Sequence, residues 1–246
     1  AGTSPGYVPK SRARFPGFSR ARVAAKVRQC HMPRIARIDV PGLPYHICIR
    51  AVAGMPCLTN DVDRLIFLEY MREAIEDGVF RLHAFVMMTN HVHILATPLE
   101  KGIMAHVMKS TSQRFAQHFN RAHDRRGPLL QGRYWSSPIE AESHFFGTQR
   151  YIELNPVRAA MVLRPADFRW SSYRHNTGRE TRPEITFHDQ YLQLGSTAAA
   201  RARAWERIVE AGIPASELTF LRKRFTRSHP LGSTDFGRRF GFELAS

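Results

Sequence analysis

The order of sequence patterns predicts an α+β domain with a partly helical appendage at its C-terminal end. Residues 44–154 alternate between period-2 apolar patterns, which are typical of strands, and 3.6-residue patterns, which are typical of helices. Their order is strand, helix, strand, strand, helix, strand, helix. After about residue 176 this order is lost, and only residues 198–211 and 216–225 again favour helices.

The first strand and helix are defined by their patterns and by a cap. Residues 44–52 alternate and contain β-branched side chains, which predicts a strand. Asn60 or Asp61 is suited to cap a helix that runs to about Asp77, and Gly78 ends it.

A hairpin and a long amphipathic helix follow. Residues 79–88 and 91–97 are strand-like and are joined by the short polar turn Thr89-Asn90, which predicts two antiparallel strands. Apolar residues then recur at helical spacing from about Gly102 to Ala122, and the outer face of this helix is basic and rich in amides.

A short strand and a final helix complete the domain. A basic loop over residues 121–132 leads to a strand at 136–140 and to a helix from about Ala141 to Leu154, which Pro156 terminates. An antiparallel sheet with helices on one face gives a ferredoxin-like α+β sandwich, and this is the architecture we expect.

We expect three segments along the chain. Residues 1–31 hold seven Lys/Arg and no acidic residue, and we expect a basic, disordered extension that precedes a natural translation start at Met32. Residues 32–176 form the main domain. Residues 177–246 form an accessory region, and residues 177–183 are its linker.

The charge of the chain indicates an anionic partner. Lys and Arg outnumber Asp and Glu by 36 to 21, which gives a formal net charge of +15. Residues 32–246 alone hold 29 basic and 21 acidic residues, so about half of the excess lies outside the N-terminal segment. Nucleic acid is the commonest partner of such a surface, and a basic tail on an ordinary enzyme is the alternative.

Cysteine content and hydropathy indicate in which cellular compartment the protein is found. Three cysteines without a C-x-x-C pair argue against a disulfide framework or a zinc finger and fit a reducing compartment. No apolar run approaches the roughly 20 residues that span a bilayer, and residues 1–31 lack the apolar centre of a secretory signal. We therefore expect a cytoplasmic protein with no membrane partner.

The most informative stretch is Asn90-His91-Val92-His93, at the start of the second hairpin strand. Side chains at i and i+2 of a strand project to the same side, so His91 and His93 are neighbours while Val92 faces the core. Two neutral imidazoles on one face are the beginning of a divalent-metal site. Taken alone, two histidines at this spacing more often form only hydrogen bonds than bind a metal.

A second pattern lies in the last helix, where Tyr151 and Asn155 are four residues apart and share one face. An amide oxygen is a hard ligand suited to Mg²⁺ or Mn²⁺. Two histidines, an amide and a phenol form a nuclease-like set, in which the metal grips a phosphate and the phenol attacks it. The alternatives are a core tyrosine and an asparagine that ends the helix.

Together these motifs resemble the HUH single-tyrosine transposases, and among them most closely the REP-associated tyrosine transposases of bacteria. The resemblance covers about residues 32–176, and its motifs follow one another in the same order as in the family. The stretches that carry it are residues 88–93 (MTNHVH), 131–137 (QGRYWSS), 151–159 (YIELNPVRA) and 170–173 (WSSY).

The resemblance implies a metal-dependent enzyme that cleaves and rejoins single-stranded, hairpin-forming DNA in the bacterial nucleoid. It implies that Tyr151 is the nucleophile, which becomes joined to the 5′ phosphate and leaves a free 3′-OH. It also implies that His91 and His93 bind Mg²⁺ or Mn²⁺, with Asn155 as the third ligand. Either a monomer or a homodimer fits the resemblance.

Basic and aromatic side chains between these motifs are candidates for contact with the DNA. They are Lys109, Arg114, Arg121, Arg125, Arg126, Arg133 and Trp135. The cations would neutralise phosphates and the tryptophan would stack on an unpaired base, while a solvated face and a core aromatic are the alternatives. Two other functions stay open: a DNA-binding protein without catalysis, and a metal-dependent nuclease in which water attacks.

Overall fold

The computed structural model describes residues 37–241, whose contacts join them into one compact unit. The predicted N-terminal extension over residues 1–31 lies outside the described residues. The strands are β1 (Tyr45–Arg50), β2 (Phe80–Met87), β3 (His91–Pro98) and β4 (Trp135–Pro138). The helices are α1 (Asp61–Ala74), α2 (Ile103–Ala122), α3 (Ala141–Glu153), α4 (Asn155–Arg158), α5 (Tyr173–Asn176), α6 (Asp189–Leu192), α7 (Ala198–Glu210), α8 (Ala215–Thr226) and α9 (Thr234–Arg238).

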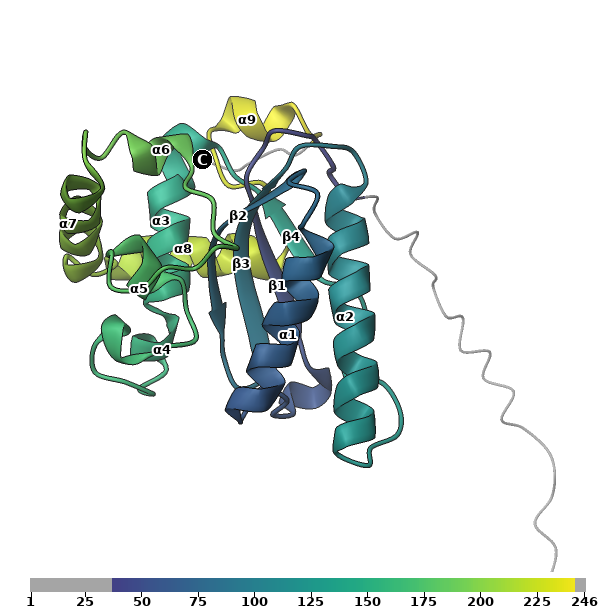
Figure 1. Cartoon of the computed structure of the whole chain (residues 1–246). Helices are drawn as coiled ribbons and strands as arrows, with labels where there is room; N and C mark the ends of the chain where they lie inside the picture. The colour runs from purple at the N-terminus through teal and green to yellow at the C-terminus, as the bar shows by residue number, and fades with distance from the viewer. Residues whose placement is uncertain (1–36, 242–246) are drawn as a thin grey trace, which may run out of the picture. The chain divides into compact units, whose positions relative to one another are not determined.

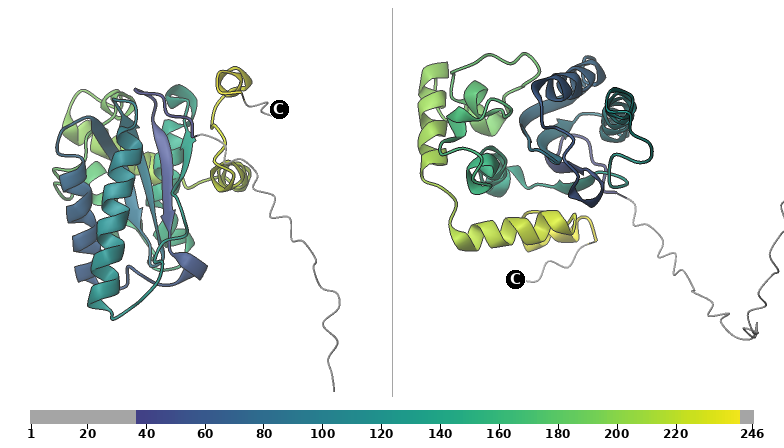
Figure 2. Two further views of the ribbon diagram at one scale, coloured as in Figure 1. Left: turned by 90° about the vertical axis from the view of Figure 1, so that its right-hand side faces the viewer. Right: turned by 90° about the horizontal axis from the view of Figure 1, so that it is seen from below.

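The four strands form one antiparallel sheet in the order β2-β3-β1-β4, which confirms the predicted α+β class. The predicted layer of helices on one face is formed by α1 and α2, which lie side by side (Figure 1). Helix α3 covers the opposite face, and α8 lies on that side next to β4 (Figure 2). A second layer is needed because β3 is buried along almost its whole length and therefore on both of its faces.

The helices begin and end near their predicted positions. Asn60 caps α1 as expected, because its side-chain oxygen accepts from the Asp63 backbone N–H at 2.8 Å. Helix α1 ends at Ala74, three residues earlier than predicted, because Ile75 leaves the helical conformation and Gly78 follows one turn later with a φ of 72°. Within the described part of the chain, no helix is long and apolar enough to cross a membrane.

Segments that follow residue 176 are bound to both edges of the sheet. At the β2 edge, the Thr186 backbone N–H donates to the Leu82 carbonyl at 2.7 Å. At the other edge, the Leu231 N–H donates to the Pro138 carbonyl at 2.8 Å. These bonds cover strand edges that would otherwise expose unpaired backbone groups. The division of the chain at residue 176 stays a prediction.

Candidate functional site

The pairing of β1 with β3 determines which side chains share the polar face of the sheet. His91 lies opposite Arg50, and His93 lies opposite Cys48. Residues directly opposite each other point the same way, so these four side chains project to one side. They line a cavity of about 370 Å³, whereas Val92 lies among apolar side chains on the other face. The predicted same-face placement of the two histidines is confirmed.

Five of the predicted site residues line this one cavity. They are His91 and His93 from β3, Trp135 from β4, Tyr151 from α3, and Asn155 at the start of α4. These residues lie far apart in the sequence, so the sheet and the helix on its polar face assemble the site together.

Two hydrogen bonds decide which nitrogen of His91 is free. The Asn90 amide nitrogen donates to the Gly54 carbonyl at 2.9 Å, which turns the Asn90 amide oxygen toward His91. That oxygen lies 2.6 Å from His91 Nδ1 and accepts a hydrogen bond from its N–H. The other ring nitrogen, Nε2, therefore keeps its lone pair, and this form of imidazole binds metals.

His93 is held by a histidine that sequence reasoning missed. His93 Nδ1 lies 2.8 Å from Nε2 of His46, and the two rings stack with their centroids 5.0 Å apart. With the proton on His93 Nδ1, His46 accepts the bond and His93 Nε2 keeps its lone pair. Both side chains are buried, so water does not compete for this hydrogen bond.

Burial also keeps these histidines neutral. It lowers the pKa of His91 to about 4 and that of His46 to about 3, and it lowers the pKa of His93 well below its ordinary value. Neutral imidazole is the form that metal ligation requires. Among residues 37–241, no group of three His, Cys, Asp or Glu side chains is arranged to hold a metal ion. Two histidines with the amide of Asn155 nevertheless form a donor set that fits a divalent cation.

Asn155 lies where the tyrosine helix ends. Helix α3 ends at Glu153, and α4 begins at Asn155 with Pro156 in its first turn. No side-chain cap forms there, and the Asn155 amide has no hydrogen-bond partner in the part of the chain that the structure describes. The alternative role of a capping asparagine is therefore not observed, and a free amide lies at the cavity wall.

Tyr151 is surrounded by aromatic rings and cations. Its ring meets His93 and Phe225 edge to face at centroid distances of 5.7 and 5.2 Å. The Arg158 guanidinium lies 4.4 Å from the ring centroid and donates to the Tyr151 carbonyl at 2.8 Å. Burial raises the pKa of the Tyr151 hydroxyl, and the charges of Arg158 and Arg222 act in the opposite direction. A core tyrosine would explain the burial but not these two cations.

Comparison with known proteins relates this domain to a family. A family model described as IS200-like transposase matches residues 39–155, which hold all four strands and end at Asn155. Residues 39–155 of the chain are therefore similar to the IS200-like transposases. The metal-ligand and nucleophile candidates all fall within this matched segment.

Two solved structures are similar to this chain. One is a REP-associated tyrosine transposase bound to a REP hairpin, with a TM-score of 0.50 and 20% identity over 64% of this chain and 93% of that chain. At this identity the likeness shows a shared fold. The other, from Deinococcus radiodurans R1, is provisionally described as a transposase and has a TM-score of 0.35 and 21% identity over 48% of this chain and 94% of that chain. No curated protein sequence matches the chain.

The cations of α2 lie away from the cavity that holds Tyr151. Lys109, Arg114 and Arg121 belong to the helix layer on the opposite side of the sheet (Figure 2). The Arg114 guanidinium lies 4.1 Å from the Tyr70 ring centroid and pairs with Glu73, so it stabilises the contact between α2 and α1. DNA contact by these three residues stays a prediction.

The remaining candidates lie in the loop before β4 and at the first position of β4. Arg125 donates to the Pro128 carbonyl at 2.8 Å and to the Asn120 side chain at 3.0 Å, which stabilises the loop itself. Arg126 and Arg133 are exposed, and Trp135 is the one candidate of this group that lines the cavity.

Several residues of the cavity wall were not among the predicted site residues. They are His46, Cys48, Arg50, Gln131, Arg222, Phe225 and Thr226. A weak signal existed for the first three, because they alternate along one face of the predicted first strand. No local pattern indicates that a helix beginning about 60 residues after Tyr151 contributes the last three.

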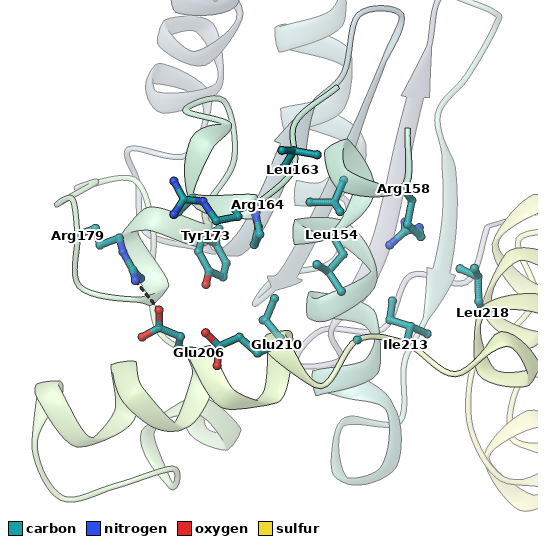
Figure 3. Close-up of a pocket in the computed structure, with 15 residues that line it drawn as sticks. Leu154, Arg158, Leu163, Arg164, Tyr173, Arg179, Glu206, Glu210, Ile213 and Leu218 are labelled. Atoms are coloured by element: carbon teal, nitrogen blue, oxygen red, sulfur yellow. Dashed lines mark hydrogen bonds and ion pairs between the residues drawn. The ribbon is translucent and has the colours of Figure 1, made fainter. Parts of the chain in front are cut away.

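A second cavity, of about 750 Å³, is lined by residues between Leu154 and Leu218 (Figure 3). It is lined largely by apolar side chains such as Leu154 and Ile213. Arg179 pairs with Glu206 in its wall, so part of its charge is already neutralised. It contains none of the predicted site residues, and we therefore place the functional site in the smaller cavity.

Proposed function

We propose that this protein is a transposase that cleaves and rejoins single-stranded, hairpin-forming DNA through a 5′-phosphotyrosine at Tyr151. The observation that carries the proposal is the shared cavity, where Tyr151 lies with the ligand candidates His91, His93 and Asn155. All four residues come from one chain, so a monomer contains the complete set and a homodimer is not required.

In this proposal, His91, His93 and Asn155 hold Mg²⁺ or Mn²⁺. When bound, such a cation neutralises charge on the scissile phosphate and stabilises the oxygen that leaves. The contribution of the protein is to present two neutral imidazoles with free Nε2 atoms, which the hydrogen bonds to Asn90 and His46 favour.

The reaction exchanges one phosphodiester bond for another. The Tyr151 oxygen bonds to phosphorus and its proton passes to solvent, while the bond between phosphorus and the 3′ oxygen breaks. The 3′ oxygen takes up a proton, so one DNA end carries a 3′-OH and the other is joined to Tyr151 through its 5′ phosphate. Attack of a 3′-OH on this linkage reverses the step and rejoins DNA without an external energy source.

Charge and shape support single-stranded hairpin DNA as the partner. The cavity is lined by Arg50 and Arg222, and no acidic side chain is among the described residues that line it. Trp135 lies at the same wall and offers a ring on which an unpaired base can stack. The relative with the same fold was solved with a REP hairpin bound.

Trapping of a covalent adduct tests this proposal. The full chain is incubated with Mg²⁺ and end-labelled hairpin DNA from the sequence that flanks its gene, and a denaturing gel is run. We expect labelled protein with the unaltered chain and with the matched control Tyr134→Phe, and none with Tyr151→Phe, which still binds the DNA.

The other outcomes identify the rival functions. Cleavage by Tyr151→Phe at the unaltered rate would assign the attack to water. Hairpin binding without either cleavage or adduct would assign the protein to non-catalytic DNA binding.

A further inference from the structure

The C-terminal helix α8 forms one wall of the cavity although it lies outside the residues that match the transposase family. Its contribution consists of Arg222, Phe225 and Thr226. Figure 2 shows α8 next to the sheet on the face opposite α1 and α2. The site is therefore incomplete without a helix that the family match does not include.

Three contacts hold α8 against strand β1 and the tyrosine helix. Phe225 is 6% exposed and stacks on His46 with ring centroids 3.7 Å apart. Arg150 of α3 forms an ion pair with Glu217 of α8 at 2.6 Å. Gly147 of α3 permits this approach, since a Cβ there would lie 2.9 Å from Glu217 Oε1.

Among residues 37–241, Arg222 is exposed and has no acidic partner, whereas Arg158, which also has none, is half-buried and donates to the Tyr151 carbonyl. Arg150 and Arg179 are each paired with a glutamate. Arg222 is exposed, and among residues 37–241 its side chain interacts with the Tyr151 side chain and with the like charge of Arg158. An accessible guanidinium with spare donors thus lies beside the proposed nucleophile.

We propose that Arg222 binds the phosphate that Tyr151 attacks, so that α8 supplies a catalytic residue of the transposase. This proposal rests on the proposed function of Tyr151. A guanidinium presents parallel N–H donors that match two oxygens of a phosphate, and charge on these oxygens changes as phosphorus is attacked. Donors fixed at that position stabilise the transition state more than they strengthen binding of the substrate.

Removal and replacement of the guanidinium test the role of Arg222. Cleavage of the labelled hairpin DNA is measured with Arg222→Ala, Arg222→Lys and the matched control Arg227→Ala, an exposed arginine of the same helix end that does not line the cavity. We expect kcat to fall about 10²- to 10³-fold for Arg222→Ala, as for the loss of one transition-state donor. KM should change far less, Arg222→Lys should recover part of kcat, and Arg227→Ala should resemble the unaltered chain.

Chemical rescue separates this role from a structural one. Guanidinium chloride at millimolar concentration should restore part of the kcat of Arg222→Ala, whereas the same concentration of sodium chloride should not. An unaltered kcat for Arg222→Ala, or a loss that neither lysine nor guanidinium recovers, would overturn the role of Arg222 alone. Absence of an adduct with the unaltered chain would instead overturn the proposed function and, with it, this role.

Discussion

At the scale of single residues, the site depends on hydrogen bonds that set the form of two imidazoles. Asn90 is oriented by its bond to the Gly54 carbonyl and therefore accepts from His91 Nδ1. His46 Nε2 is the partner of His93 Nδ1, and when His46 accepts this bond, His93 Nε2 keeps its lone pair. Asn90 and His46 can therefore affect metal binding without touching the metal, because a partner that accepts from Nδ1 leaves Nε2 unprotonated.

The variant Asn90→Ala tests this arrangement. Loss of the amide oxygen releases His91 to rotate and to change its tautomer, so we expect affinity for Mn²⁺ to fall about 10- to 100-fold. Isothermal titration calorimetry of the full chain measures the change. The matched control is Asn120→Ala, which removes a bond to the Gly127 carbonyl in the loop after α2. Equal affinity in both variants would show that Asn90 does not position the ligand.

At the scale of elements, a buried carboxylate joins the tyrosine helix to the segments that follow residue 170. Glu153 is 0% exposed, and its oxygens accept from Ser172 and Asn176 at 2.6 Å each and from Trp205 Nε1 at 2.8 Å. Burial raises the pKa of Glu153 to about 7, and these donors act in the opposite direction. The C-terminal helix α7 therefore stabilises the end of α3 from which Tyr151 projects.

The variant Trp205→Phe measures how much the hydrogen bond from Trp205 to Glu153 contributes to the free energy of unfolding. The substitution keeps an aromatic ring but leaves one oxygen of Glu153 with a donor fewer, which costs about 1–3 kcal/mol in the free energy of unfolding. Urea denaturation at pH 8 gives the value. The control is Trp170→Phe, whose Nε1 donates to the exposed Asp61 and whose loss should cost less. Equal destabilisation in the two variants would mean that the bond to Glu153 adds nothing beyond ring packing.

At the scale of the whole molecule, the sheet separates an apolar helix layer on one face from the candidate site on the other. Helices α1 and α2 bury one face, and α3 and α8 enclose the polar face (Figure 2).

His83 lies at the irregularity of the edge strand β2, between Leu82 and Ala84, and connects this edge to the segment that contains Thr186. Its Nδ1 lies 2.7 Å from the Thr186 carbonyl, and its Nε2 lies 2.8 Å from the Thr97 hydroxyl.

The buried His83 makes the stability of the molecule sensitive to acid. Burial lowers the pKa of His83 to about 3, below the ordinary value of 6.5. Between these two pH values the unfolded chain therefore binds more protons than the folded chain. The stabilisation is complete above pH 6.5 and is lost as the pH falls toward 3, at about 1.4 kcal/mol per pH unit.

Urea denaturation between pH 4 and pH 8 measures this loss. We expect His83→Gln to reduce the slope below pH 6.5 by about 1.4 kcal/mol per pH unit and to leave the slope above pH 7.5 unchanged. An identical acid slope in both proteins would show that His83 does not remain neutral in the folded state.

Local patterns predicted the parts of the site that local geometry determines. The period of a strand brings His91 and His93 to one side, and the spacing of Tyr151 and Asn155 spans the end of one helix. His46 and Arg50 depend on the register of β1 against β3, which no single segment encodes. Arg222 depends on the packing of α8, and a basic helix such as α2 does not reveal from its own sequence which face of the sheet it covers.

Mass spectrometry of the trapped adduct tests the central claim most directly. After the reaction with hairpin DNA, nuclease and trypsin should release the peptide of residues 151–158, which follows Arg150, ends at Arg158 and contains one tyrosine. We predict that this peptide carries the mass of a nucleotide joined through its 5′ phosphate to Tyr151, and that the other DNA end is a free 3′-OH. A nucleotide on another residue, or cleaved DNA with an unmodified peptide, would contradict the account.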